Sequence, residues 1–217
     1  MMKNVKQREL SAGLMFRTSN PLPVMEHFYT LQGEGAYTGV PSYFIRLAGC
    51  DVGCVWCDVK ESWKPHHDQY HDLTEMLGWV QEAGADRVVI TGGEPSVYDL
   101  RPLTEKLRKA GLAVHLETAG PHPLLGEFDW VCFSPKKFLP PNPEYYHQAD
   151  ELKIVIYHES DLTWAEEHAA RCAPEVRLFL QPEWSRRDRV TPVIIEYIKS
   201  NPHWSLSQQT HKYLDIP

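Results

Sequence analysis

The chain has 217 residues, a formal net charge of −7, and 42% hydrophobic and 24% charged residues, a composition ordinary for a soluble globular protein. The acidic balance argues against nucleic acid as a partner, because a nucleic-acid interface needs a basic face. No apolar run is long enough for a membrane span or a signal peptide, so no membrane association is predicted. The five cysteines are odd in number and unevenly spaced. They do not suggest a disulfide framework, and we expect a reducing, cytoplasmic location.

In chain order, residues 1–23 form a polar leader containing two prolines near its end, which we expect to be flexible. Residues 24–217 are expected to form a single catalytic domain. Within it, apolar β-rich runs alternate with amphipathic helical patterns almost to the end. Strands are predicted at residues 42–49, 87–91, 113–118, 130–134, 152–157, 176–181 and 204–209. Helices are predicted around residues 73–80, 100–110, 161–172 and 187–199.

Short apolar strands separated by amphipathic helices indicate a parallel sheet that is buried on both faces. Seven short strands are too few for a complete eight-stranded barrel. The predicted fold is therefore an α/β protein, a partial and open parallel β/α barrel with reduced helix content. Polar clusters follow six of the seven predicted strands, and the carboxyl ends of strands build the site in α/β barrels. We expect the functional site at these ends.

Three cysteines lie within eight positions, at Cys50, Cys54 and Cys57. One interpretation is a structural zinc site with a fourth ligand from His66, His67 or His71, although structural zinc usually has a closed shell built from paired motifs. The other is a 4Fe–4S cluster held by three thiolates, with its fourth iron open to a ligand. The spacing favours the cluster and leaves zinc open. The two remaining cysteines, Cys132 and Cys172, are expected to be buried apolar residues.

The segment TGGEP at residues 91–95 strengthens the cluster interpretation. Its glycines let the backbone approach a ligand closely, and the Glu94 carboxylate can pair with a ligand ammonium. An open iron followed by a glycine pair and a carboxylate resembles the radical S-adenosylmethionine (SAM) superfamily. That resemblance implies that SAM chelates the open iron and is cleaved reductively to a 5′-deoxyadenosyl radical. Trp56 lies where the superfamily usually has an aromatic residue near the adenine.

Seven motifs extend this resemblance, in the order FYTLQGEGAYTGVPSYFIRLAGC, CDVGCVWCD, ITGGEP, ETAG, SPK, LQP and QTHKYLDIP. Together they resemble the 7-carboxy-7-deazaguanine synthase family over residues 24–217. The resemblance implies a lyase that converts 6-carboxy-5,6,7,8-tetrahydropterin to 7-carboxy-7-deazaguanine with loss of ammonia, on the route to queuosine and other 7-deazapurines. It also implies a barrel of the radical SAM type, a homodimer, and a flavodoxin-like or similar reductant.

The family resemblance further implies individual roles, with the three clustered cysteines as cluster ligands. The residues implied for SAM binding are Trp56, Cys57, Asp58, Gly93, Glu94, Ser134, Pro135, Lys136, Gln181 and Pro182. The residues implied for pterin binding are Leu31, Gln32, Gly33, Glu34, Arg46, Thr91 and Pro217, the last through its terminal carboxylate. Arg46 offers a planar fork of donors that matches a carboxylate, and the alternative for it is an internal salt bridge. Thr118 is either a further contact or a strand-end cap.

Val59 departs from the family pattern, which commonly has Thr or Ser after the Cys-Asp pair to help coordinate a Mg²⁺ that touches the substrate. The Val59 side chain has no oxygen, and Mg²⁺ prefers hard oxygen ligands. Only Asp58 and water could replace the missing hydroxyl as ligands, so we expect weak or absent dependence on Mg²⁺. Two other functions remain as alternatives. They are an activating enzyme for a glycyl-radical protein and a non-enzymatic zinc or iron–sulfur module.

Overall fold

The computed structural model describes residues 21–217, and the predicted leader lies, over residues 1–20, outside the described residues. Within this range one sheet has the strand order β3-β1-β2-β4-β5-β6-β7-β8-β9. Its strands are β1 Leu22–Leu31, β2 Pro41–Leu47, β3 Tyr70–His71, β4 Arg87–Gly92, β5 Ala113–Thr118, β6 Trp130–Phe133, β7 Glu151–Ile156, β8 Arg177–Pro182 and β9 Trp204–Leu206. Neighbours from β2 to β9 are parallel. The predicted class, an open and mostly parallel β/α barrel, is confirmed.

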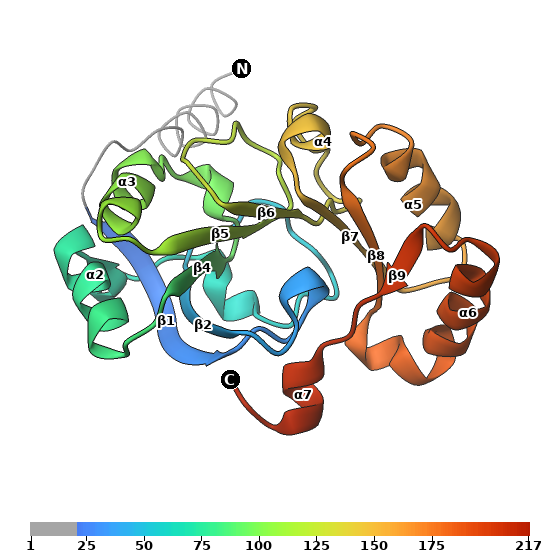
Figure 1. Ribbon diagram of the computed structural model, residues 1–217, viewed down its shortest axis with the longest axis horizontal. Coiled ribbons are helices and arrows are strands. Elements are labelled where there is room, and N and C mark those ends of the chain that lie inside the picture. The colour runs from blue at the N-terminus through green and yellow to red at the C-terminus, as the bar shows by residue number, and fades with distance from the viewer. Residues whose placement is uncertain (1–20) are drawn as a thin grey trace, which may run out of the picture.

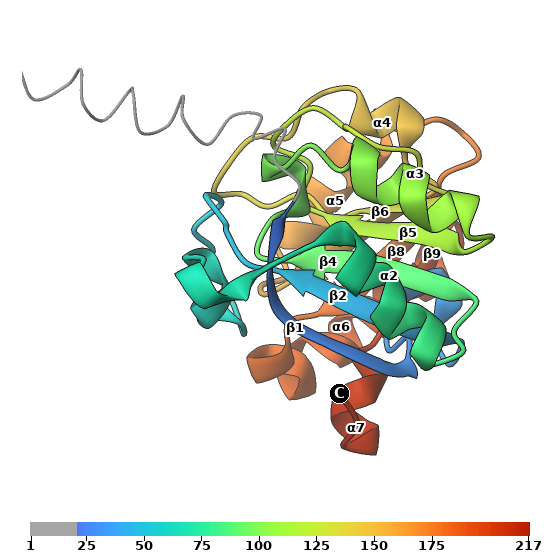
Figure 2. The same ribbon diagram turned by 90° about the vertical axis from the view of Figure 1, so that its left-hand side faces the viewer.

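Helices cover the outer face of the curved sheet (Figure 1). They are α2 Leu73–Glu82, α3 Arg101–Lys109, α4 Tyr145–Gln148, α5 Asp161–Ala169 and α6 Arg187–Ser200. The last helix, α7 Thr210–Leu214, lies apart from them (Figure 1). Helices α2 and α3 pack side by side on this face (Figure 2). In α2 the buried residues Leu73, Met76 and Val80 recur at helical spacing, so one apolar stripe faces the sheet. None of the helices in residues 21–217 is long and apolar enough to cross a membrane.

The core lies between these helices and the sheet. Ile45 of β2, Ile90 of β4 and Leu116 of β5 are almost completely buried, as expected for aliphatic residues in parallel strands covered on both faces. The interior face of the sheet carries polar side chains, among them Lys153 on β7. The sheet therefore separates an apolar layer under the helices from a polar interior.

The sequence did not indicate four of these elements, one of which, β3, has only two residues. Strand β1 pairs antiparallel with β2 and β3 and carries an irregular burial pattern, so it lacks the alternation that marks a strand. Helix α4 and helix α7 have four and five residues, too few to show helical periodicity. The strand predicted over residues 204–209 ends at Leu206, and the chain then turns into the interior.

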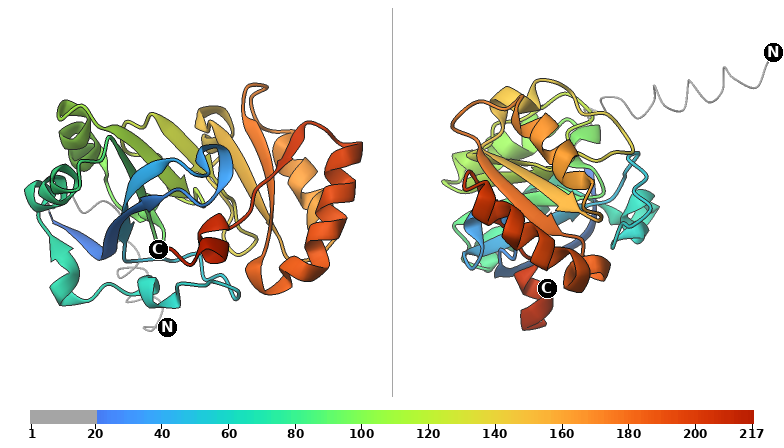
Figure 3. Two further views of the ribbon diagram at one scale, coloured as in Figure 1. Left: turned by 60° about the horizontal axis from the view of Figure 1, so that its bottom comes forward. Right: turned by 90° about the vertical axis from the view of Figure 1, so that its right-hand side faces the viewer.

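The C-terminal segment spans the gap between the two ends of the open sheet. The Thr210 backbone N–H donates to the Gly33 carbonyl oxygen at 2.9 Å, and the Gly35 N–H donates to Ser207 Oγ at 2.9 Å. Figure 3 (left) shows α7, in red, beside the blue β1–β2 hairpin. Residues that follow β9 therefore close the interior where the strands do not.

Candidate active site

A cavity of about 230 Å³ opens at the carboxyl ends of the parallel strands. Several parallel strands end at the wall of this cavity, as the polar clusters that follow the predicted strands indicate. Of the residues singled out from the sequence, it is lined by Glu34, Cys50, Cys54, Trp56, Cys57, Asp58, Thr91, Gly93, Glu94, Thr118, Ser134, Lys136, Gln181 and Pro182. The structure therefore brings the cysteine loop and the implied SAM-binding residues together, with the exception of Pro135.

The cysteine loop follows β2 and is held mainly through its backbone. The Gly49 N–H donates to the Ser62 carbonyl at 2.6 Å, and the Cys57 N–H donates to the Cys54 carbonyl at 3.1 Å. Burial raises the pKa of Cys54 to about 11, against the opposing charge of Lys136. Burial likewise raises the pKa of Cys50. These thiols are therefore protonated near neutral pH, and metal binding must release their protons.

The cysteines suit a cluster better than a single zinc ion. Within residues 21–217, no three His, Cys, Asp or Glu side chains converge on one ion. A 4Fe–4S cluster does not need such convergence, because each thiolate binds a different iron atom. The alternative zinc ligands His66, His67 and His71 do not line the cavity that contains the cysteines. In addition, His71 Nδ1 pairs with Glu75 Oε1 at 3.1 Å. The donor set fits a three-thiolate cluster.

Two glycines bring the end of β4 against the start of the cysteine loop. Gly92 has φ +149°, and a Cβ there would lie 2.2 Å from the Leu47 carbonyl oxygen. A Cβ on Gly93 would lie 2.4 Å from the Gly49 carbonyl oxygen. A larger residue at either position would push the two backbones apart, so the glycine pair lets the end of β4 pack directly against Leu47 and Gly49 before the cysteines.

Glu94 is 1% exposed, and its carboxylate accepts three hydrogen bonds from the protein. The Ser96 N–H donates at 2.9 Å, the Ala119 N–H at 2.8 Å, and the Thr118 hydroxyl also donates to it. Thr118 Oγ1 in turn accepts from the Gly120 N–H at 2.9 Å. Glu94 and Thr118 thus join the ends of β4 and β5, and Thr118 has the strand-end capping role as well as a place on the cavity wall.

At the neighbouring end of β6, the Ser134 N–H donates to the Thr118 carbonyl at 2.8 Å, and Lys136 Nζ donates to the carbonyl and the hydroxyl oxygen of Ser134, at 2.5 and 2.6 Å. Burial lowers the pKa of Lys136. Pro135 lines an adjoining cavity of about 490 Å³ instead. Trp56 lines both cavities, and its ring lies 6.2 Å from that of Phe138 in an edge-to-face arrangement.

A further cavity of about 150 Å³ borders the cysteine cavity. The seven residues implied for pterin binding all line it, namely Leu31, Gln32, Gly33, Glu34, Arg46, Thr91 and Pro217. The two cavities share Glu34, Asp58, Thr91, Glu117 and Gln209 as lining residues. A ligand in one cavity therefore lies directly beside a ligand in the other. We call these the cysteine cavity and the second cavity.

Arg46 enters the second cavity from β2, where strand pairing places it between Glu26 of β1 and Thr91 of β4. Its Nε lies 2.5 Å from Glu26 Oε1. Arg46 thus lines the second cavity and also forms the salt bridge considered as its alternative role. The ion pair fixes one side of the guanidinium group.

Gly33 leaves room for the C-terminal segment, because a Cβ there would lie 2.2 Å from His211 Nδ1. His211 lines the second cavity, and burial lowers its pKa, so the ring is neutral at pH 7. Pro217 lines the same cavity. The QTHKYLDIP motif therefore reaches the interior at both of its ends.

The residues around Asp58 do not fit a magnesium site. Val59 contributes only a hydrocarbon side chain to the second cavity. Asp58 Oδ2 lies 2.7 Å from Lys212 Nζ, and this ion pair, against the effect of burial, lowers the pKa of Asp58. The carboxylate that would remain to hold a cation already faces an ammonium group.

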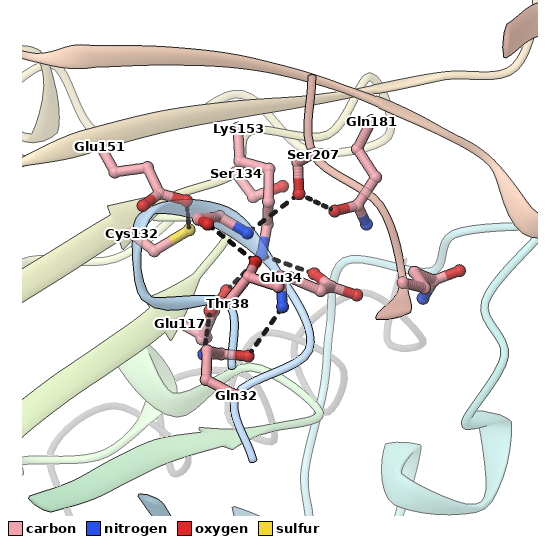
Figure 4. A network of polar contacts seen from close by, with 12 residues as sticks. Gln32, Glu34, Thr38, Glu117, Cys132, Ser134, Glu151, Lys153, Gln181 and Ser207 are labelled. Carbon is pink, nitrogen blue, oxygen red and sulfur yellow. Dashed lines mark hydrogen bonds and ion pairs between the residues drawn. The ribbon is translucent and has the colours of Figure 1, made fainter. Parts of the chain in front are cut away.

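Under both cavities lies a buried polar network that sequence reasoning largely missed (Figure 4). Lys153 Nζ lies 2.6 Å from Glu34 Oε2 and 2.7 Å from Glu117 Oε2. Gln32 Nε2 donates to Glu117 Oε1 at 3.2 Å. A usable signal existed, since a lysine inside the apolar strand LKIVIY needs a buried partner. Glu117 and His211 lay inside recognised motifs without an assigned role.

The fold and the three-cysteine cavity are those of a radical SAM enzyme, and residues 44–140 match the Radical SAM superfamily. The 7-carboxy-7-deazaguanine synthase of Flavobacterium psychrophilum is 50% identical over 90% of this chain and 93% of its own length. That of Escherichia coli K12 is 38% identical over 89% and 98%. The crystal structure of QueE from Escherichia coli has a TM-score of 0.78 and 35% identity, covering 88% of this chain and 95% of that one. This chain belongs to the 7-carboxy-7-deazaguanine synthase family, as its motifs predict.

Proposed function

We propose that this chain is a radical SAM lyase that converts 6-carboxy-5,6,7,8-tetrahydropterin to 7-carboxy-7-deazaguanine with loss of ammonia. Membership of the synthase family supports this reaction over the glycyl-radical activating enzyme and the non-enzymatic module. The structural observation that carries it is the shared wall of the two cavities. A cofactor beside the cysteines and a substrate in the second cavity meet across Thr91 and Glu117.

The cysteine cavity takes the cluster and SAM. When bound, the cluster supplies an electron and SAM supplies the carbon radical that removes a hydrogen atom from the substrate. Cys50, Cys54 and Cys57 would hold the cluster, and we assign Gly93, whose missing Cβ lets the chain pack against the Gly49 backbone, to SAM binding. We assign the other SAM contacts to Trp56, Cys57, Asp58, Glu94, Ser134, Pro135, Lys136, Gln181 and Pro182. The Glu94 carboxylate also accepts three protein donors, so it holds the wall in shape as well.

The second cavity takes the pterin. Its walls combine one guanidinium, at Arg46, with the carboxylates of Glu34 and Glu117, and a carboxypterin offers the complementary groups. The substrate carboxylate suits Arg46, whereas the amino and ring N–H groups of the pyrimidine edge need acceptors such as carboxylates. Leu31, Gln32, Gly33, Thr91 and Pro217 also line this cavity, and we assign them to pterin binding. The terminal carboxylate of Pro217 is a further acceptor for the pterin.

We further propose that Mg²⁺ is not needed. Val59 has no ligand atom, and the Asp58 carboxylate is engaged by Lys212. A cation at this point would have to displace an ammonium group from 2.7 Å. A homodimer, a flavodoxin-like reductant, a cytoplasmic location and a single catalytic domain over residues 24–217 remain predictions from the sequence.

The decisive experiment is anaerobic incubation of the reconstituted protein with 6-carboxytetrahydropterin, SAM and a reductant. We expect 7-carboxy-7-deazaguanine by mass spectrometry, together with about four irons and four sulfides per chain. A protein with a full cluster that cleaves SAM but makes no deazaguanine would contradict the proposal. Zinc in place of iron, with no SAM cleavage, would favour the zinc-module alternative.

A further inference from the structure

Lys153 lies at the centre of the buried network between the two cavities. It projects from β7, and its side chain is 4% exposed. Its ammonium group contacts Glu34, from the loop after β1, at 2.6 Å, and Glu117, from the end of β5, at 2.7 Å. Figure 4 shows both carboxylates pointing at this one nitrogen. A single cation therefore joins two carboxylates that belong to distant parts of the chain.

Further titratable groups around Lys153 and its two carboxylates are Glu151, Cys132, Lys136 and His211. Burial raises the pKa of Glu151 and of the Cys132 thiol, and the Cys132 thiol donates to the Glu151 carboxylate at 3.4 Å. Burial lowers the pKa of Lys136, which bonds Ser134 instead. Burial also lowers the pKa of His211, which faces Glu34. Lys153 is thus the cation nearest to both carboxylates.

The charge of Lys153 overcomes the cost of burying Glu34. Burial alone would raise the pKa of Glu34, but the charge and hydrogen bond of Lys153 bring it to about 2. The pKa of Lys153 is in turn held well above its usual value by the surrounding acidic groups, against its own burial. Within this triad, two carboxylates and one ammonium leave one excess negative charge. The Glu34 and Glu117 side chains are 18% and 20% exposed, so their remaining oxygen lone pairs can accept hydrogen bonds from a ligand in the adjoining cavities.

We infer that Lys153 is a positioning residue, which keeps Glu34 and Glu117 charged and side by side so that the pair can bind the donor-rich edge of the substrate. This inference rests on the proposed function. Without the cation, two adjacent buried carboxylates repel each other and share a proton. One of them then presents an O–H donor toward the N–H donors of the ligand. Lys153 acts through the carboxylates and not by touching the reacting atoms.

The test compares the pH profiles of the cluster-loaded wild type and Lys153→Met. In the variant we expect KM for the pterin to rise about tenfold or more at pH 7, while kcat falls by less than about threefold. Its kcat/KM should then rise between about pH 6.5 and about 8.5, as the shared proton is lost. The ratio of the wild-type kcat/KM to that of the variant should shrink over the same range. Iron content should be unchanged.

Three further variants separate positioning from a merely structural role. Lys153→Arg keeps the charge and should restore the wild-type profile. Adding Glu34→Gln to Lys153→Met removes the second carboxylate, so the pH dependence should disappear although KM stays high. Lys199→Met is the matched control, because this exposed lysine of α6 pairs with Glu196 at 3.0 Å and lines neither cavity. A merely structural lysine would lower activity equally at every pH and would not respond to Glu34→Gln.

An unchanged KM and pH profile in Lys153→Met would overturn the inference. If that variant does not fold, the wild-type profile decides. A wild-type KM that increases about tenfold from pH 8 to pH 6.5 would mean that the carboxylates already share a proton, and would also overturn it. A flat wild-type KM would support it. Absence of product from the wild type itself contradicts the proposed function instead, so the two failures are distinguishable.

Discussion

The two halves of the site are prepared for their ligands in opposite ways. The cysteine loop is held mainly by backbone hydrogen bonds such as Cys50 N–H to the Trp63 carbonyl, at 3.1 Å, and burial raises the pKa of Cys50 and Cys54. The network under the second cavity is already paired, with Lys153 between Glu34 and Glu117. In the first half, Cys50 and Cys54 must lose protons before they bind metal, whereas in the second half the charged groups are already paired.

The difference follows from what each ligand supplies. A metal cluster forms strong bonds to its ligands, and their free energy offsets the cost of deprotonating the thiols and ordering the loop. An organic substrate brings only hydrogen bonds and ion pairs, so a site that must reorganise on binding loses much of the available affinity. We therefore expect damage to the cysteine half to remove the cluster and leave the carboxylate half intact. Damage to the carboxylate half should leave the cluster in place.

The largest expected effect comes from Cys54→Ser, which removes one of three thiolates. Cluster content should fall to near zero and turnover by about a thousandfold or more, whereas the folded content by circular dichroism should not change. Cys172→Ser is the matched control, since this half-buried cysteine lies outside both cavities. A variant at position 54 that retains four irons would show that the loop does not hold the cluster as assigned.

The next largest effect on activity is expected from extending the chain beyond Pro217. The terminal residue lines the second cavity, so added residues would displace its carboxylate and obstruct the substrate. We expect kcat/KM to fall about tenfold or more with the iron content unchanged. The same extension at the N-terminus provides the control. Unchanged kinetics with a C-terminal tag would place the chain end outside the working site.

A smaller effect is expected where Glu151 holds the β1–β2 loop in place. Its Oε2 accepts from the Ala36 N–H at 2.9 Å and from Trp130 Nε1 at 3.3 Å. Glu151→Leu leaves two buried donors unpaired and should destabilise the fold by about 2–4 kcal/mol, seen as a lower melting temperature. Glu151→Gln keeps an acceptor and should cost less than about 1 kcal/mol. Equal melting temperatures for the two variants would contradict this role.

The smallest effect is expected from magnesium. Removing divalent cations with a chelator should change the initial rate by less than about twofold, because Lys212 already faces Asp58. Val59→Thr alone should not create a requirement, since the ammonium remains in place. A steep dependence of the wild type on Mg²⁺ would refute the assignment.

Much of the fold was predictable because it repeats. The parallel strands β2 and β4 to β9 are short apolar runs, and α2, α3, α5 and α6 carry a regular buried stripe. The elements that were missed, β1, β3, α4 and α7, are irregular or too short for a period to develop. Likewise, the cysteines and the glycine pair can be recognised from their spacing in the sequence. The roles of Lys153 and His211 cannot, because they depend on contacts with residues more than thirty positions away.

The sequence by itself determined the class of chemistry. Three thiols in eight positions and a glycine pair one strand later are local patterns. Such patterns can be recognised without knowledge of the tertiary structure. Only the tertiary structure decided which charges meet. Lys153 selects Glu34 and Glu117, and Lys212 faces Asp58 beside Val59, because the curvature of the sheet and the return of the C-terminal segment bring distant residues to one interior. Coulombic pairing acts over a few ångströms in space, and distance along the chain does not reveal it.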